Sequence, residues 1–200
     1  MEMKIITPPF RIKPEPTILA PAVERLYAEV FGPARFAKAS HQFRAGRPPT
    51  PGLSWIAVEN DRVIGAIRYW PVGIGETDHP ALLLGPLAIA HVWRNRGIGT
   101  ALVCKTLDLA RRAGHDLILL VGDRDYYERF GFAPATPYGL AMAEEKRPER
   151  LQVLSLAATP LGRVRGDIHP AIGVLPKPRR YRPFALASGK DGRSGQRLPV

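Results

Sequence analysis

Apolar residues form short runs along this chain, separated by stretches rich in glycine, proline and charged side chains. Continuous or alternating apolar runs are typical of strands, and apolar residues three and four positions apart are typical of helices. We therefore expect strands at 10–13, 53–59, 63–72, 81–89, 116–121 and 151–157, with a further short strand near 162–167. Helical spacing predicts helices at 22–31, 34–44 and 97–113, and a short helix at 126–130.

The strands at 81–89 and 116–121 are separated by the long helix at 97–113, a connection that allows them to pair in parallel. The other strands are joined by shorter segments, which favour antiparallel pairing. Pro86 has no N–H group and predicts a bulge in its strand. The pattern predicts an α/β fold: a mixed, mostly antiparallel central sheet flanked by helices. Two parallel strands that splay apart would leave a slot for a narrow ligand arm.

Charge is distributed unevenly along the chain. The net charge is +11 over 200 residues, and 174–200 holds seven basic residues and one acidic residue, a surplus of six. That segment is also rich in proline and glycine and has no sustained period. We expect a domain at 1–173 and a basic, irregular tail at 174–200. The tail is interpreted as a solvated extension; the alternative is a nucleic-acid contact made by neutralising phosphates.

Composition excludes several other classes of protein. The single cysteine, Cys104, excludes an internal disulfide framework and a cysteine-based metal site, so no metal is expected. Its position inside the predicted helix at 97–113 favours a small buried thiol. Residues 1–16 lack the apolar core of a signal peptide, and no apolar run is long enough to cross a membrane. A cytoplasmic location is the default expectation.

The strongest chemical signal is a basic glycine turn between the strand at 81–89 and the helix that follows it. It reads Arg94, Asn95, Arg96, Gly97, Ile98, Gly99 and Thr100. Glycines let the backbone approach a ligand closely, and a helix start offers unpaired N–H groups to an anion. The turn lacks the Lys of a Walker P-loop and the third glycine of a dinucleotide fingerprint. What remains is the spacing R-x-x-G-x-G.

A second block supports the same interpretation. After the strand at 116–121, the chain reads Tyr-Tyr-Glu-Arg-Phe-Gly-Phe at 126–132. Gly131 stands where a helix end needs a left-handed residue. Together the two blocks resemble the GCN5-related N-acetyltransferases (the GNAT superfamily). The segments at 31–38, 84–89 and 121–123 are similar to its YhbS-like branch of predicted N-acetyltransferases, a resemblance that covers roughly the first 170 residues.

The resemblance implies acetyl-CoA as co-substrate, an amine as acceptor and direct transfer between them. Pantetheine would be held by backbone groups of Leu87, Ala88 and Ile89, and the pyrophosphate would bind at 94–100. Tyr127 would act as general acid toward the departing thiolate, and Tyr126 would pack elsewhere. The chain departs from the family at 122–125, Gly-Asp-Arg-Asp, where many members carry an Asn that contacts CoA.

The acceptor and the general base stay open. His91 follows the central strand, and Glu76, Asp78 and His79 lie on a predicted loop, but none forms an organised motif. By the same resemblance, the helical segment at 34–44 would border the acceptor, and its basic residues favour an acidic or phosphorylated one: Arg35, Lys38, His41 and Arg44. Two alternatives to an enzyme remain, namely a non-catalytic acyl-CoA-binding module and a nucleic-acid-associated protein that acts through its tail.

Overall fold

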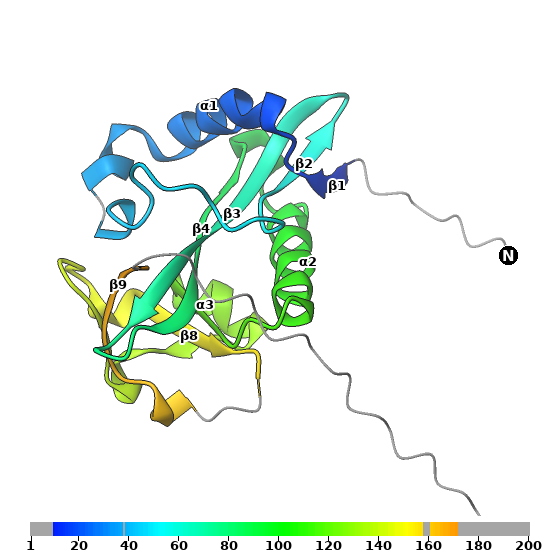
Figure 1. Cartoon of the computed structure of the whole chain (residues 1–200). Coiled ribbons are helices and arrows are strands. Elements are labelled where there is room, and N and C mark those ends of the chain that lie inside the picture. Colours follow the sequence, from blue (N-terminus) through cyan, green and yellow to red (C-terminus); the bar gives the residue numbers. More distant parts are fainter. Residues whose placement is uncertain (1–9, 38, 158–160, 172–200) are drawn as a thin grey trace, which may run out of the picture.

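A nine-stranded sheet forms the centre of the protein (Figure 1). The computed structural model describes residues 10–37, 39–157 and 161–171. The strands run in the order β1-β2-β3-β4-β5-β8-β6, and β9 pairs with both β3 and β7. Their bounds are β1 Arg11–Pro14, β2 Trp55–Glu59, β3 Arg62–Ile74, β4 His79–Ile89, β5 Leu117–Val121, β6 Ala133–Pro134, β7 Leu140–Met142, β8 Leu151–Ser155 and β9 Gly166–Pro170.

Most of the strand pairs are antiparallel, and the parallel ones are β4 with β5 and β7 with β9. The mixed, mostly antiparallel sheet predicted from the sequence is therefore confirmed. The parallel pairing of β4 and β5 follows from the crossover through α2 (Ile98–Arg112), as expected from its length.

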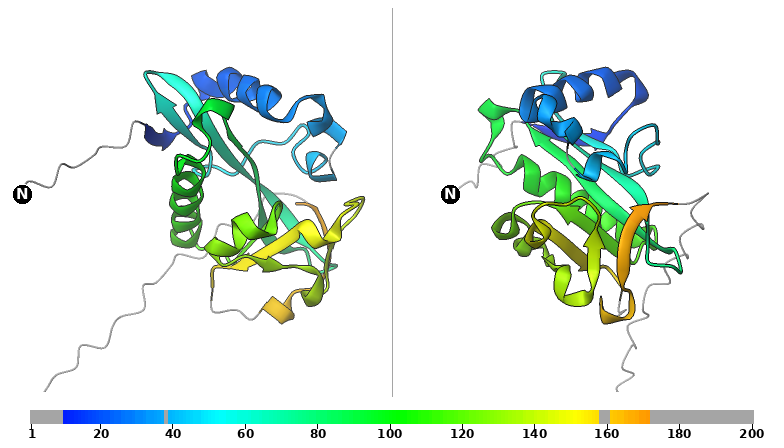
Figure 2. Two further views of the ribbon diagram at one scale, coloured as in Figure 1. Left: turned by 180° about the vertical axis from the view of Figure 1, so that it is seen from behind. Right: turned by 90° about the vertical axis from the view of Figure 1, so that its left-hand side faces the viewer.

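Two helices cover opposite faces of the sheet (Figures 1 and 2). The buried face of α2 packs on one side, on a core that includes Ala57 of β2 and Ile118 of β5. Helix α1 (Ala20–Phe31) packs on the other side, against Ile56 and Val58, which alternate with Ala57 along β2. The short α3 (Arg124–Tyr127) and the 3-10 turn Glu128–Phe130 follow β5.

A bulge interrupts β4 at the position expected for Pro86. Ile67 of β3 pairs with Leu87 and Tyr69 pairs with Leu84, so that Gly85 and Pro86 both stand opposite one residue of β3. The extra residue reverses the alternation of faces. Leu84 before the bulge and Leu87 after it therefore both pack toward the core beneath α2.

Several elements differ from the sequence-based predictions. The segment at 34–44 is not an α-helix; it forms 3-10 turns at Pro33–Ala37 and Ala39–His41. Its apolar residues are too sparse to bury one helical face, and side-chain contacts shape it instead. The predicted loop at 73–80 is shortened because β3 and β4 extend into it, and the last strand lies at 166–170 rather than 162–167.

Cys104 is exposed, which corrects the expectation of a buried thiol. The buried positions of α2 are Ile98, Leu102, Val103, Thr106, Leu107 and Ala110, and residue 104 falls on the opposite side of the helix. The predicted tail at 174–200 lies outside the described residues. Among the described residues, no helix has both the length and the apolar character needed to span a membrane.

Candidate active site

A gap opens between β4 and β5 toward their carboxyl ends. The two strands pair at Leu82 with Ile118 and at Leu83 with Leu119. The pairing found in the described structure stops there, although β4 continues to Ile89 and remains paired with β3. The edge of β4 after the bulge therefore faces no strand, and its backbone polar groups are free to bind an extended ligand.

The hydrogen-bond pattern shows which residues of β4 face this gap. The N–H group of Ala90 donates to Ile64 O across the β3 side at 2.9 Å. Because pairing alternates along an antiparallel strand, the backbone groups of Ala88 also point to β3, and those of Leu87 and Ile89 point to the gap. Of the three residues expected to hold pantetheine, Leu87 and Ile89 thus have the suitable orientation, and Ala88 is committed to the sheet.

The basic glycine turn lies directly after the end of β4. Gly97 has a left-handed φ of +77° and precedes the first residue of α2. The first helical bond runs from Ala101 N–H to Gly97 O at 2.9 Å, so the N–H groups of Ile98, Gly99 and Thr100 have no acceptor within the helix. No side chain caps this end of α2. The helix start therefore presents unpaired donors, as an anion site requires.

The cations of this turn lie at the surface. Arg94, Asn95 and Arg96 are exposed, and the Arg96 guanidinium lies 4.8 Å from the centre of the Trp93 ring. Asn95 adopts a left-handed φ of +61°, a conformation that asparagine tolerates better than most residues. The turn carries two charged side chains next to the free donors of α2.

Gly99 brings the helix start, β4 and α3 together. A Cβ atom at Gly99 would stand 2.5 Å from the Tyr126 hydroxyl oxygen and 3.9 Å from Cγ1 of Ile89. The absence of a side chain therefore lets the Tyr126 ring approach the first turn of α2. Burial raises the pKa of Tyr126, and a hydrogen bond with Thr100 opposes that shift. Tyr126 is thus a wall of the predicted pyrophosphate site.

Tyr127 points to a different place. Its ring is enclosed by aromatic neighbours, with Tyr126 at 4.9 Å, Phe132 at 5.7 Å and Phe130 at 6.3 Å between ring centres. Burial raises the pKa of its phenol, so the hydroxyl stays protonated at neutral pH. The hydroxyl has no hydrogen-bond partner among the described residues. Tyr127 therefore presents a protonated hydroxyl that none of the described residues binds.

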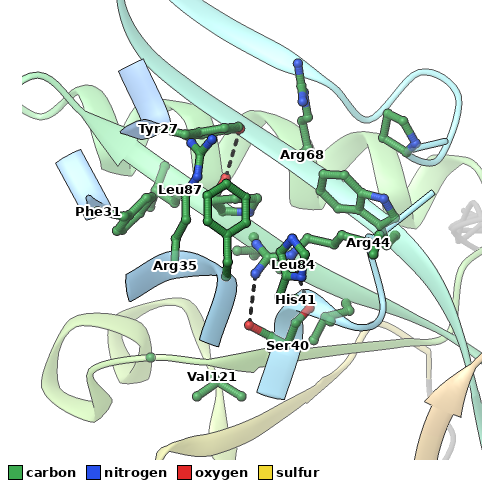
Figure 3. A pocket seen from close by; sticks show the side chains of 18 of the residues that line it. Tyr27, Phe31, Arg35, Ser40, His41, Arg44, Arg68, Leu84, Leu87 and Val121 are labelled. Carbon is green, nitrogen blue, oxygen red and sulfur yellow. Dashed lines mark hydrogen bonds between the residues drawn. The ribbon is translucent and has the colours of Figure 1, made fainter. Parts of the chain in front are cut away.

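A cavity of about 460 Å³ lies between the bulge of β4, the end of β5 and the segment after α1. Tyr127, Gly122 and Val121 line it from the β5 side, and Gly85 and Pro86 line it from β4. Basic side chains also line it: Arg35, His41, Arg44 and Arg47 come from the segment after α1, and Arg68 comes from β3. Figure 3 labels Arg35, His41, Arg44 and Arg68. The cavity thus joins the β4–β5 gap to a cationic compartment.

Comparison with known proteins agrees with this geometry. Residues 20–132 match the model of the acetyltransferase (GNAT) family. The uncharacterized N-acetyltransferase YhbS of Escherichia coli strain K12 is 30% identical over 156 residues, which cover 78% of this chain and 92% of YhbS. The chain belongs to the GNAT acetyltransferase family. The family expected from the glycine turn and the block at 126–132 is therefore confirmed.

Solved GNAT structures match over most of the chain. The structure of Escherichia coli YhbS in complex with CoA has a TM-score of 0.73 at 27% identity, covering 84% of this chain and 92% of its own. A GNAT acetyltransferase from Brucella melitensis in complex with acetyl-CoA has a TM-score of 0.61 at 26% identity, covering 80% and 94%. Both similar proteins were thus solved with CoA or its acetyl thioester bound.

Other candidates from the sequence lie away from this GNAT site. His91 is exposed on the 3-10 turn His91–Trp93 and does not line the cavity. Glu76, Asp78 and His79 line a separate hollow beside β9, where Asp78 lies 3.8 Å from His169. Of the four basic residues expected near the acceptor, three line the cavity and Lys38 lies outside the described residues. Of the carboxylates on the described cavity walls, Glu24 pairs with Arg68 and Asp123 accepts a hydrogen bond from the Tyr126 N–H group, so neither is assigned as a general base.

Sequence reasoning missed several residues of the cavity wall, Tyr27 and Arg68 among them. Tyr27 lies on the apolar face of α1 and donates from its hydroxyl to Pro86 O at 3.3 Å. Arg68 stands opposite the bulge and bonds to Glu15 and Glu24. Tyr27 carried no signal, because an aromatic residue at helical spacing is ordinarily core. A lone arginine in the middle of an otherwise apolar strand was a usable signal for Arg68.

Proposed function

We propose that this chain transfers an acetyl group from acetyl-CoA to an amine, with Tyr127 as the general acid. The observation that carries the proposal is the position of Tyr127, which lines one cavity together with the bulge of β4 and the end of β5. The free edge at Leu87 and Ile89 is suited to pantetheine, and the donors of Ile98, Gly99 and Thr100 are suited to the pyrophosphate.

The residues present fit such a ligand in two respects. The space beside Gly97 is open, since a Cβ atom there would meet nothing within 4 Å, so phosphates can approach the backbone. The β4–β5 gap is narrow because the two strands are still paired at Leu83 and Leu119, a few residues before it. A narrow gap that leads from an anion site to a wider cavity suits a long, thin arm with a charged end.

Acetyl-CoA supplies the acetyl group as a thioester. In the proposed transfer, the amine nitrogen bonds to the carbonyl carbon and the carbon–sulfur bond breaks. The sulfur then takes the phenolic proton of Tyr127. The amine loses one proton to solvent, and solvent returns one to Tyr127. Backbone N–H groups of β4 at the gap polarise the carbonyl oxygen. Burial of Tyr127 keeps the proton on the phenol until the thiolate forms.

Release of free thiol from acetyl-CoA, followed with amines and peptides as acceptors, tests this proposal. Mass spectrometry of the product should show one acetyl group on the amine nitrogen for each thiol released. Tight binding of acetyl-CoA without thiol release over the whole panel would contradict catalysis and favour the non-catalytic binding module. An acetylated Tyr127 that accumulates during turnover would contradict direct transfer.

A further inference from the structure

One arginine of the cavity is held in place without a carboxylate. Arg44 is half-buried, and its Nε donates to Ser40 O while its Nη2 donates to Ser40 Oγ, both at 3.1 Å (Figure 3). Its guanidinium also lies 5.9 Å from the centre of the Trp70 ring. These contacts use one edge of the guanidinium and fix its orientation.

Two neighbouring cations of this wall are already compensated. Arg68 bonds to Glu15 and to Glu24, and Arg35 lies 3.6 Å from Glu24. Glu24 interacts with Arg44 only through longer-range electrostatics. Among the described residues, no carboxylate forms an ion pair with Arg44. The cavity therefore holds a fixed positive charge that the protein itself does not balance.

The outer edge of Arg44 is available to a ligand. Its Nη1 has no hydrogen-bond partner among the described residues, and Nη2 keeps a second hydrogen beside it. Two parallel donors of this kind match the two oxygens of a carboxylate or a phosphate. Burial lowers the pKa of Arg44, which means that its charge is poorly solvated where it stands. An anion at the outer edge would offset that loss of hydration.

We propose that the acceptor is a small amine that carries a carboxylate or a phosphate, bound through this anion to the outer edge of Arg44. This inference rests on the proposed acetyl transfer, because it names the acceptor class of the same cavity. A cavity of about 460 Å³ has the size of a small-molecule site. Arg44 and Tyr127 line the same cavity, so the amine of a molecule held by Arg44 can face the gap.

The same charge selects against amines of another kind. A cationic cavity repels a polyamine, whose remaining charges would stay unpaired. An acceptor with one anionic group avoids this repulsion, because its anion offsets the charge of Arg44.

Matched pairs of amines test the proposal on the full chain. The panel consists of α-amino acids, each beside its uncharged α-amide, and of phosphoethanolamine beside ethanolamine. Thiol release from acetyl-CoA gives kcat/KM, and calorimetry on the CoA-bound protein gives the affinity of each amine without turnover. In at least one pair, we expect the anionic amine to have at least tenfold higher kcat/KM and at least tenfold higher affinity than its neutral partner. The two kinds of pair separate carboxylate from phosphate.

Arg44→Gln and Arg44→Lys then test the residue. We expect Arg44→Gln to raise KM for the anionic amine about tenfold to a hundredfold and to reduce the advantage of that amine over its neutral partner by the same factor, while acetyl-CoA still binds. Arg44→Lys keeps the charge but loses the planar fork, so its effect should lie between wild type and Arg44→Gln. Arg111→Gln, an exposed arginine on α2, is the matched control for the loss of one charge.

The outcomes separate the two proposals. Acetyl transfer that proceeds equally well with charged and neutral members, or binding of no anionic amine, overturns the Arg44 site and leaves the transferase intact. Binding of anionic amines that Arg44→Gln abolishes, without any thiol release, supports the site and contradicts acetyl transfer. Equal losses with Arg44→Gln and Arg111→Gln would also overturn the proposal, because the effect would then be one of net charge.

Discussion

The Tyr127 ring lies directly over the Cα of Gly122: a Cβ atom on Gly122 would stand 2.5 Å from Cε2 of the ring and 2.9 Å from Cδ2. Gly122 is the first residue after β5, in the segment where this chain lacks the Asn of many GNAT proteins. The glycine therefore makes room for Tyr127 at the edge of the β4–β5 gap.

Gly122→Ala should displace the Tyr127 ring and reduce kcat for acetyl transfer by about tenfold or more, because a shift near 1 Å at the reacting group is costly. The affinity for CoA should change little, since the free donors of α2 are untouched. Gly162→Ala is the matched control, because a Cβ atom there meets nothing within 4 Å. Equal kcat values in the two variants would show that Gly122 does not position Tyr127.

Gly99→Ala should weaken CoA binding through Tyr126. The new methyl group would collide with the Tyr126 hydroxyl and push the ring toward the pyrophosphate site. Removing that hydroxyl relieves the collision, so the double variant with Tyr126→Phe should recover part of the lost affinity. Calorimetric titration of CoA against both single variants and the double variant measures this coupling. Strictly additive losses would mean that the two residues act independently.

Arg68→Met should lower the free energy of unfolding by about 3 kcal/mol, since it leaves the buried carboxylate of Glu15 without its partner. The side chains of Arg68 and Glu15 are 10% and 5% exposed. Arg112→Met is the matched control: its pair with Asp108 is exposed, and we expect a loss of about 0.5 kcal/mol or less. Urea unfolding of both variants measures these losses of free energy. Equal losses in the two variants would contradict the prediction.

The pH dependence of kcat follows from the raised pKa of Tyr127. A general acid is active while protonated and is lost as the pH rises through its pKa. Burial moves that loss above the ordinary tyrosine value of about 10, so kcat should not fall between about pH 7 and pH 9.5 on account of Tyr127. A fall centred below pH 9 that Tyr127→Phe abolishes would contradict a buried phenol.

The sequence predicted the parts of the protein that local chemistry determines. Pro86 cannot donate a hydrogen bond, and the bulge lies there. Gly114 has a left-handed φ of +81° after α2, as a helix-capping glycine should. Gly131, likewise left-handed, ends the 3-10 turn that follows Tyr127. Proline restricts the backbone, and glycine adopts without strain the left-handed conformation that a helix end requires, so the neighbours along the chain suffice to place each residue.

Other features depend on contacts between distant segments. The residues at 34–44 form 3-10 turns whose shape depends on bonds such as Arg44 to Ser40 and Arg35 to Glu24. The two- and three-residue strands β6 and β7 are too short to show a period. Cys104 is different, because the helical spacing of α2 already placed it on the exposed side. In this helix the spacing of apolar residues is a better guide than the general preference of cysteine for burial.

The comparison of Tyr127→Phe with Tyr126→Phe tests the central claim most directly. The two rings meet nearly at a right angle, with an interplanar angle of 88°, and only Tyr127 lines the cavity. We predict that Tyr127→Phe lowers kcat for acetyl transfer by about a hundredfold while the Kd for CoA stays within about twofold. Tyr126→Phe should keep kcat. Full activity in Tyr127→Phe, or loss of kcat confined to Tyr126→Phe, would contradict the assignment of Tyr127 as the general acid.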